Sequence, residues 1–326
     1  MGNMLELVPS IPEGNCVQYG IWPSCQGQCK FCVRKDRRFL GTEKRKLNID
    51  FIRNNITAID WKGQFSPGIS ILGGEVYCWD CPEENKLYLD LVEDIIEKIL
   101  KVSPNPYVKY STVTNGMYDP NILLYPVVDK IKDAVGMKCV DVNFSYDLKY
   151  RYWREGQREL VLKNIQDFRK RYDYKVGVQM ILAQYVVDMW ENKEIDFHKI
   201  IGEDLKGCHL AFLYPHDVNS GINLPDFFLK RKPFLRFISW YRREFPENYM
   251  SFYYSTMNSG TFKYTGLFDR AGMYCPDKIP FDVYQQPVLS DGKEILNPAC
   301  GHSTIYTCYQ DSDKCLLCDL MNLGEA

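Results

Sequence analysis

The sequence lacks an excess of charge of either sign. Its 40 Lys and Arg residues nearly balance 42 Asp and Glu residues, and the formal net charge is −2. A global basic surface for nucleic acid and a polyanionic surface for cationic partners are therefore both unsupported by composition. A nucleic-acid or nucleotide substrate stays open only through local features.

Long hydrophobic runs are also missing. No stretch approaches the ~18 consecutive apolar residues that cross a membrane. The first ten residues, MGNMLELVPS, have neither the basic start nor the apolar run of a secretory signal. We therefore expect no membrane partner and a reducing, cytoplasmic location, where clustered cysteines bind metal or do redox chemistry more often than they form disulfides.

Internal repeats and low-complexity tracts are absent as well, so repeat and fibrous architectures are not expected. The 326 residues are 45% hydrophobic and 25% charged, which is typical of a globular chain with a sizeable core. This length fits one large domain or two ordinary ones.

Short β-like runs alternate with helical patterns through the first two thirds of the chain. The predicted strands are Val17–Trp22, Ile69–Leu72, Val108–Val113, Val140–Ser145, Lys175–Leu182 and His209–Leu213. Apolar residues recur at helical spacing between them, in 49–59, in 88–99 (where Ser103 and Pro104 should end the helix) and at Leu160, Val161, Ile165 and Phe168.

This alternation predicts an α/β fold, with a parallel sheet that right-handed crossovers curl into an open or partial barrel. Chemistry in such folds lies at the C-terminal ends of the strands. The pattern fades after about Pro215. We therefore expect an α/β domain over residues 1–219 and an aromatic, cysteine-rich extension over residues 220–326.

Cysteine is the unusual residue type, with thirteen in the chain. Cys25, Cys29 and Cys32 follow the first predicted strand as Cys-x3-Cys-x2-Cys, in a loop marked by Pro23 and Gly27. Three thiolates in one tight loop can bind three irons of a cubane cluster and leave the fourth iron open. A zinc site is the alternative, but no fourth His or Cys ligand follows before Cys78.

The triplet, with Phe31 before its last cysteine, resembles the signature loop of the radical S-adenosylmethionine (radical SAM) superfamily. The resemblance covers roughly residues 15–215 and implies a partial (β/α)6, TIM-like barrel. It implies a [4Fe–4S] cluster whose open iron chelates S-adenosylmethionine, and an electron donor such as a flavodoxin or ferredoxin. Reductive cleavage would yield a 5′-deoxyadenosyl radical that abstracts hydrogen from a peptide, nucleotide or small metabolite.

Further segments match the family's motifs in chain order. Gly73, Gly74 and Glu75 resemble the Gly-Gly-Glu motif that receives the methionine ammonium. Asn115 lies in a Thr-Asn-Gly turn, for which an ordinary Asn-Gly turn is the alternative. Ser145 and Asp147 resemble the Ser-x-Asp ribose contact, and Gln179 is a weaker candidate for the ribose or carboxylate. The resemblance makes these the cofactor-binding candidates: Gly73, Gly74, Glu75, Asn115, Ser145, Asp147 and Gln179.

A second cysteine group lies near the end of the chain. Its candidate ligands for a second Fe–S cluster or a zinc ion are Cys300, Cys308, Cys315 and Cys318, with His302 and Cys275 nearby. Free thiols remain the alternative. Cys78 and Cys81 could serve that second site, form a redox pair, or be inert core thiols.

Two other functions stay open at this point. A glycyl-radical-activating enzyme shares the triplet spacing, and a non-catalytic zinc-binding interaction protein would use both cysteine groups structurally. Basic and aromatic residues interleave over 229–245, which fits base stacking beside phosphate contacts or, more simply, an amphipathic helix.

Overall fold

The structure is a computed structural model. It describes residues 17–20, 25–32, 46, 49–50, 52–53, 56, 68–72, 74–78, 81–103, 108–213, 224, 226–253, 289–290, 293–294, 308–309 and 312–323. No helix among these residues is both long and apolar enough to cross a lipid bilayer.

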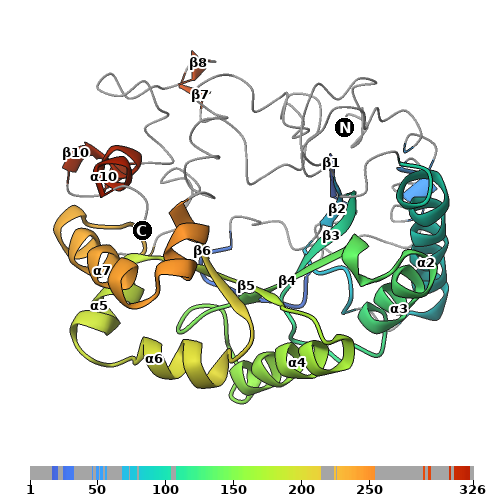
Figure 1. Cartoon of the computed structure of the whole chain (residues 1–326), viewed down its shortest axis with the longest axis horizontal. Helices are drawn as coiled ribbons and strands as arrows, with labels where there is room; N and C mark the ends of the chain where they lie inside the picture. Colours follow the sequence, from blue (N-terminus) through green and yellow to red (C-terminus); the bar gives the residue numbers. More distant parts are fainter. Residues whose placement is uncertain are drawn as a thin grey trace.

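A parallel sheet of six strands organises the described part of the chain, in the order β1-β2-β3-β4-β5-β6 (Figure 1). The strands are β1 (Val17–Gly20), β2 (Gly68–Leu72), β3 (Lys109–Thr114), β4 (Val140–Tyr146), β5 (Gly177–Ile181) and β6 (His209–Leu213). Each strand pairs with its sequence neighbour. All six predicted strands and the α/β class are therefore confirmed, with ends shifted by at most two residues.

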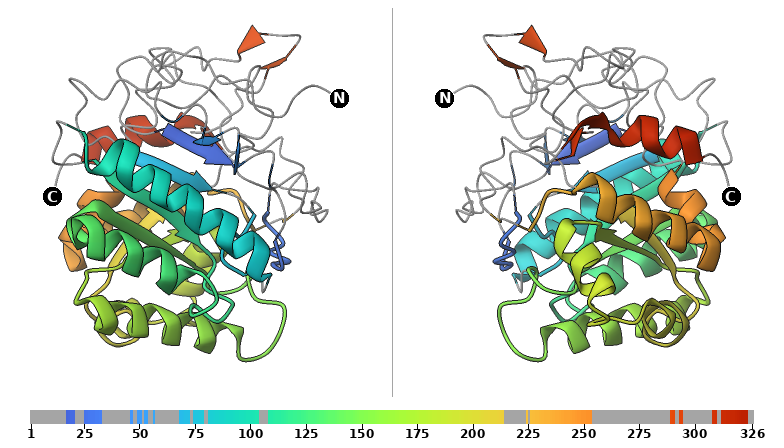
Figure 2. Two further views of the ribbon diagram at one scale, coloured as in Figure 1. Left: turned by 90° about the vertical axis from the view of Figure 1, so that its right-hand side faces the viewer. Right: turned by 90° about the vertical axis from the view of Figure 1, so that its left-hand side faces the viewer.

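The crossover helices lie in an arc along one side of the sheet (Figures 1 and 2). They are α2 (Pro82–Ile95) with a π-helical turn at Ile96–Leu100, α3 (Leu124–Val135), α4 (Gln157–Tyr172), α5 (Gln184–Glu191) and the short α6 (Phe197–Lys199). Helix α7 (Arg231–Glu244) follows β6 and continues the arc. Strand residues alternate in burial. In β4, Val142, Phe144 and Tyr146 are fully buried while Ser145 is partly exposed, because successive side chains point to opposite faces of a sheet.

The predicted helical stripes fit α2 and α4 with one exception. Val161, Ile165 and Phe168 are buried, at spacings of four and three residues along one face of α4. Leu160, predicted to share this stripe, is 37% exposed. Its position is about 100° around the helix from Val161, which turns it toward solvent.

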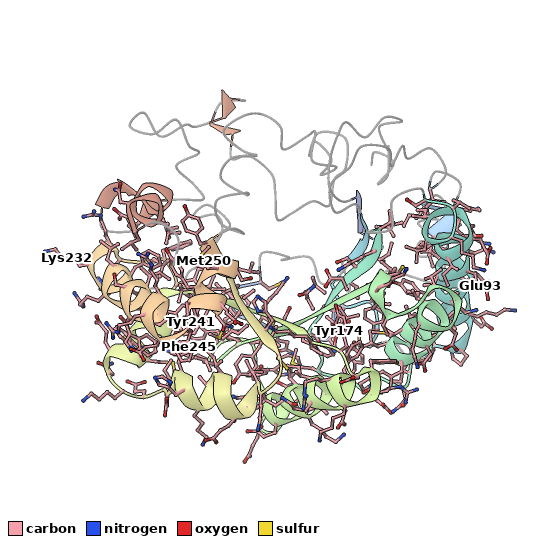
Figure 3. All side chains as sticks on the ribbon, in the orientation of Figure 1. Glu93, Tyr174, Lys232, Tyr241, Phe245 and Met250 are labelled. Carbon is pink, nitrogen blue, oxygen red and sulfur yellow. The ribbon has the colours of Figure 1, made fainter. Side chains whose placement is uncertain are left out.

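Helix α7 is amphipathic, as the simpler interpretation of the 229–245 segment proposed. Phe234, Phe237, Ile238 and Tyr241 are buried on its apolar face. Figure 3 shows Tyr241 and Phe245 among side chains between α7 and the neighbouring helices, and Lys232 on the outside. Arg236 and Arg231 pair with the carboxylates of Glu191 and Asp319. Both arginines are therefore engaged within the protein.

Elements within residues 308–323 pack against α7. Strands β9 (Cys308–Tyr309) and β10 (Ser312–Cys315) form an antiparallel pair, and α10 (Leu316–Leu323) follows directly. The Tyr309 ring packs 5.7 Å from that of Phe234, and Asp319 binds the Arg231 guanidinium. The predicted domain boundary near residue 220 lies outside the described residues.

Gly177 in β5 has no room for a side chain. A Cβ atom there would lie 2.0 Å from Asn143 Oδ1 on β4. We expect Gly177→Ala to lower the free energy of unfolding by about 1–3 kcal/mol, because overpacking forces neighbouring atoms to shift. Urea denaturation of the single and double variants with Asn143→Ala should show that removing the Asn143 side chain relieves most of this loss.

Gly202→Ala is the matched control, because a Cβ atom at Gly202 meets nothing within 4 Å. If Gly177→Ala were as benign as Gly202→Ala, the close approach of β4 and β5 would be wrong.

Candidate functional site

The cysteine loop, residues 25–32, follows β1. Cys25 and Cys32 are partly exposed, Cys29 is buried, and none of the three is in a disulfide. Gly27 lies between two of the sulfurs: its N–H donates to Cys25 Sγ at 3.1 Å, and a Cβ atom on it would lie 3.0 Å from Cys25 Sγ and 3.7 Å from Cys29 Sγ. The absence of a Gly27 side chain therefore leaves room for the sulfurs.

Glu75 joins the segment after β2 to the end of β3. Its carboxylate is 1% exposed and accepts hydrogen bonds from the Asn115 N–H at 2.6 Å, the Tyr77 N–H at 3.2 Å and Thr114 Oγ1 at 3.0 Å. These bonds hold the Asn115 turn against the Gly74–Glu75 segment. The two motifs, far apart in sequence, thus share one hydrogen-bonded group.

Asn115 extends this group to the cysteine loop. Its Nδ2 donates to Cys25 Sγ at 3.6 Å and to Gln26 Oε1 at 3.4 Å, and its Oδ1 accepts from the Met117 N–H at 2.8 Å. Cys78 also belongs here, since its Sγ lies 3.7 Å from the Glu75 carbonyl oxygen. The structure therefore brings Cys25, Glu75 and Asn115 together at one edge of the sheet.

Burial governs the electrostatics of this group. Burial raises the pKa of the Glu75 carboxyl to about 7, opposed by its hydrogen bonds from Asn115 and Tyr77. Burial, followed by the negative charge of Glu75, raises the pKa of the Cys25 thiol to about 12. Metal binding displaces thiol protons, so a metal group would hold these cysteines as thiolates. Three soft sulfur donors within one loop of eight residues are the kind of donor set that Fe–S clusters and zinc take.

The raised pKa of Glu75 predicts a pH dependence of stability in the metal-free protein. Between the unfolded value of 4.5 and the folded value of about 7, the folded state holds a proton that the unfolded state has lost. Stability attributable to Glu75 should therefore fall as pH rises through this window, by about 3 kcal/mol. Urea denaturation of wild type and Glu75→Gln measures it: the wild type should lose stability relative to the variant from pH 4.5 to pH 7. A difference that does not change with pH would contradict the assignment.

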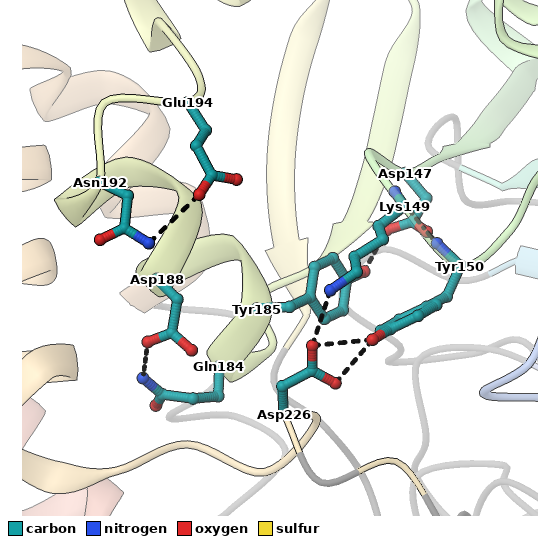
Figure 4. A network of polar contacts seen from close by, with 9 residues as sticks. All are labelled: Asp147, Lys149, Tyr150, Gln184, Tyr185, Asp188, Asn192, Glu194 and Asp226. Carbon is teal, nitrogen blue, oxygen red and sulfur yellow. Dashed lines mark hydrogen bonds and ion pairs between the residues drawn. The ribbon is translucent and has the colours of Figure 1, made fainter.

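Asp147 follows β4 and organises the loop after it. Its carboxylate is fully buried and accepts hydrogen bonds from the Tyr185 hydroxyl and from the backbone N–H groups of Tyr150 at 2.7 Å and Arg151 at 2.9 Å (Figure 4). The carboxylate is thus engaged by its own loop, and its role toward a ribose stays a prediction.

This loop carries Arg151 to the cysteines. Arg151 Nη1 lies 3.9 Å from Cys29 Sγ, and its guanidinium carbon lies 5.2 Å from the centre of the Phe31 ring. The Lys30 N–H donates to the Tyr150 carbonyl at 3.0 Å, which fixes the two loops along their backbones. The ends of β2, β3 and β4 therefore all meet the cysteine loop.

Asp226 lies just before α7 and contacts the loop that follows β4. It accepts hydrogen bonds from Lys149 Nζ at 2.8 Å and from the Tyr150 hydroxyl at 2.7 Å (Figure 4). Its neighbour Phe227 stacks on Phe31 with 5.9 Å between ring centres. The segment before α7 therefore contacts both loops.

The remaining predicted cofactor-binding residues are Ser145, Gln179, Gly73 and Gly74. Ser145 and Gln179 are partners in the register of β4 and β5, and β-strand alternation puts them on the partly exposed face. Gly74 is partly exposed next to Glu75, while Gly73 lies outside the described residues. Among the described side chains, no three of His, Cys, Asp and Glu converge as ligands of one metal ion.

The second cysteine group is placed only by its backbone. Cys308 pairs with Cys315 across β9 and β10, and Cys318 lies in the first turn of α10. Cys300 lies outside the described residues. A second metal site stays a prediction.

Sequence patterns did not point to several residues of the site. Arg151, Gln26 and Asp226 carried no motif of their own, and their roles come from contacts between loops distant in sequence. Thr114 stood inside the Thr-Asn-Gly motif, so its contact with Glu75 had a usable signal.

None of the known protein-family models matches the chain, and no curated protein sequence matches it. Among solved structures, the crystal structure of Streptococcus suis SuiB is similar, with a TM-score of 0.44 and 13% identity over 71% of this chain and 47% of that one. SuiB bound to the precursor peptide SuiA is similar with a TM-score of 0.39 and 14% identity over the same shares of the two chains. The chain thus spans about half the length of these structures.

Proposed function

We propose that the protein is a radical SAM enzyme. The observation that carries the proposal is the meeting of the Cys25–Cys29–Cys32 loop with Glu75 and Asn115 and with the loop that Asp147 organises. Parallel strands present their C-terminal ends at one edge, where α/β enzymes hold their cofactors. A chance Cys-x3-Cys-x2-Cys spacing would not require these motifs to converge.

Cys25, Cys29 and Cys32 would hold a [4Fe–4S] cluster. Bound together, the cluster and S-adenosylmethionine would supply one-electron cleavage of the sulfonium and a 5′-deoxyadenosyl radical for hydrogen abstraction. Gly73, Gly74 and Glu75 would receive the methionine ammonium, and Ser145 and Asp147 would contact the ribose. Gln179 would bind the ribose or the carboxylate, and Asn115 is a further cofactor-binding candidate.

The residues of the chain would orient the cluster ligands and exclude water from the site. Glu75 keeps the Asn115 turn in place through two donors, Thr114 Oγ1 and the Asn115 N–H, and Asn115 orients Cys25 through Nδ2. Phe227 stacks on Phe31 of the cysteine loop, which places apolar surface next to the cysteines and would limit water access.

Three further features belong to the same proposal. The sheet would be a partial (β/α)6 barrel spanning residues 1–219, with residues 220–326 as its extension. Cys300, Cys308, Cys315 and Cys318 would bind a second Fe–S cluster or zinc, supported by the pairing of Cys308 with Cys315. The enzyme would act in the cytoplasm with a flavodoxin or ferredoxin, on a peptide, nucleotide or small metabolite.

The test is formation of 5′-deoxyadenosine. Anaerobically reconstituted protein, given S-adenosylmethionine and dithionite, should be brown and should release 5′-deoxyadenosine and methionine, both measured by mass spectrometry. Colourless protein that holds only zinc and forms neither product would overturn the proposal and favour a structural metal-binding protein.

A further inference from the structure

Arg151 is held rigidly beside the buried cysteine. Its backbone N–H is bound by the Asp147 carboxylate at 2.9 Å, and the neighbouring Tyr150 is bound by Asp147 and Asp226. The guanidinium therefore starts from a fixed backbone and ends 3.9 Å from Cys29 Sγ, against the face of Phe31. Asp147 and Asp226 therefore fix the backbone segment from which the Arg151 side chain extends.

The other cations near this loop have different partners. Lys149 is paired with Asp226 and lies 4.7 Å from the centre of the Tyr150 ring, and Lys30 lies 5.4 Å from the same ring centre. Arg151, in contrast, contacts a cysteine sulfur, that of Cys29. Its guanidinium reaches the loop from the segment that follows β4.

A fixed positive charge at a cluster ligand has a defined consequence. Reduction adds one electron to the cluster and no proton, so the oxidised form plus one electron gives the more negative reduced form. A nearby cation and an N–H donor to a ligand sulfur both stabilise that added negative charge. The effect is large where water is excluded, and Cys29 is only 9% exposed.

We propose that Arg151 is the positioning residue that sets the reduction potential of the cluster on the cysteine loop, by holding its guanidinium against Cys29 and Phe31. This inference rests on the proposed function, because it needs the cluster. In this proposal, the Asp147 carboxylate would hold the backbone of Arg151 in place beside the cluster.

The experiment compares wild type, Arg151→Gln and Arg151→Lys, each reconstituted anaerobically. Iron content is measured first, and the fold of the metal-free variants is checked by circular dichroism. Mediated titration with dithionite, followed by electron paramagnetic resonance (EPR), then gives the midpoint potential. At the potential where half of the wild-type cluster is reduced, the ratio of reduced to oxidised cluster in Arg151→Gln should be about tenfold lower. This corresponds to a midpoint potential ~59 mV more negative than that of wild type.

Arg151→Lys keeps the positive charge that stabilises the reduced cluster and should stay within about threefold of wild type. Arg154→Met, an exposed arginine just beyond the same loop, is the matched control and should match wild type. Equal potentials for Arg151→Gln and wild type would overturn the inference, and so would equal shifts for the Gln and Lys variants. If Arg151→Gln assembles no cluster, the Arg151→Lys variant decides. A tenfold change in its ratio of reduced to oxidised cluster, relative to wild type, would overturn the inference. A wild type without a cluster would instead refute the proposed function.

Discussion

Replacing Cys29 by alanine is expected to abolish cluster assembly and to lower 5′-deoxyadenosine formation by more than about 100-fold. Cys29 is the buried member of the triplet, and the Arg151 guanidinium contacts its sulfur. Loss of a neighbouring group that merely orients a metal ligand costs about 10–100-fold in affinity or activity, so loss of a ligand should cost more. Iron analysis and product quantification measure the effect.

Cys208→Ala is the matched control for this prediction. Cys208 is also a partly buried free thiol, but it lies before β6, near Gln166 Nε2 at 3.9 Å. It should keep wild-type iron content and product formation. A Cys29→Ala variant that matched Cys208→Ala in both readouts would remove the cysteine loop from the chemistry.

Replacing Arg231 by methionine should release α10 from α7. Asp319 is only 8% exposed and receives two hydrogen bonds of 2.8 Å from the Arg231 guanidinium. Removing the guanidinium leaves a buried carboxylate without its main counter-charge, which is strongly destabilising in fully buried pairs. Because Arg231 itself is partly exposed, we expect a smaller loss of about 2 kcal/mol, which corresponds to roughly 30-fold faster amide exchange in residues 316–323.

Arg236 on the same helix provides the control. It pairs with Glu191, but its side chain is 58% exposed. Arg236→Met should change stability by less than about 0.5 kcal/mol and leave exchange in α10 unaltered. Hydrogen–deuterium exchange read by mass spectrometry separates the two variants. Equal protection of α10 in both would show that the Arg231–Asp319 pair does not hold this helix.

The strands were predictable because local sequence determines them. In β4, Val, Phe and Tyr alternate with polar residues, and β6 is a short run of Leu, Ala and Phe. Helical patterns separate such strands, which leaves a parallel sheet as the consistent arrangement. Leu160 was wrongly predicted to lie on the apolar stripe. It is at the edge of that stripe, where a step of one residue along the helix turns the side chain by about 100°.

The site was predictable only in its motifs. The cysteine triplet, Glu75 and Asn115 could be grouped because strand ends share one edge of the sheet. The engagement of Asp147 with its own loop, the contact of Arg151 with Cys29 and the stack of Phe227 on Phe31 depend on how loops fold over each other. No periodicity encodes such long-range pairings, so they required the three-dimensional structure.

The measurement that tests the central claim most directly is EPR of the reduced, anaerobically reconstituted wild type before and after addition of S-adenosylmethionine. The account predicts a [4Fe–4S] signal whose shape changes on addition, because S-adenosylmethionine would bind to the cluster that the three cysteines would hold. A protein without an iron signal, or a signal unchanged at saturating S-adenosylmethionine, would contradict it.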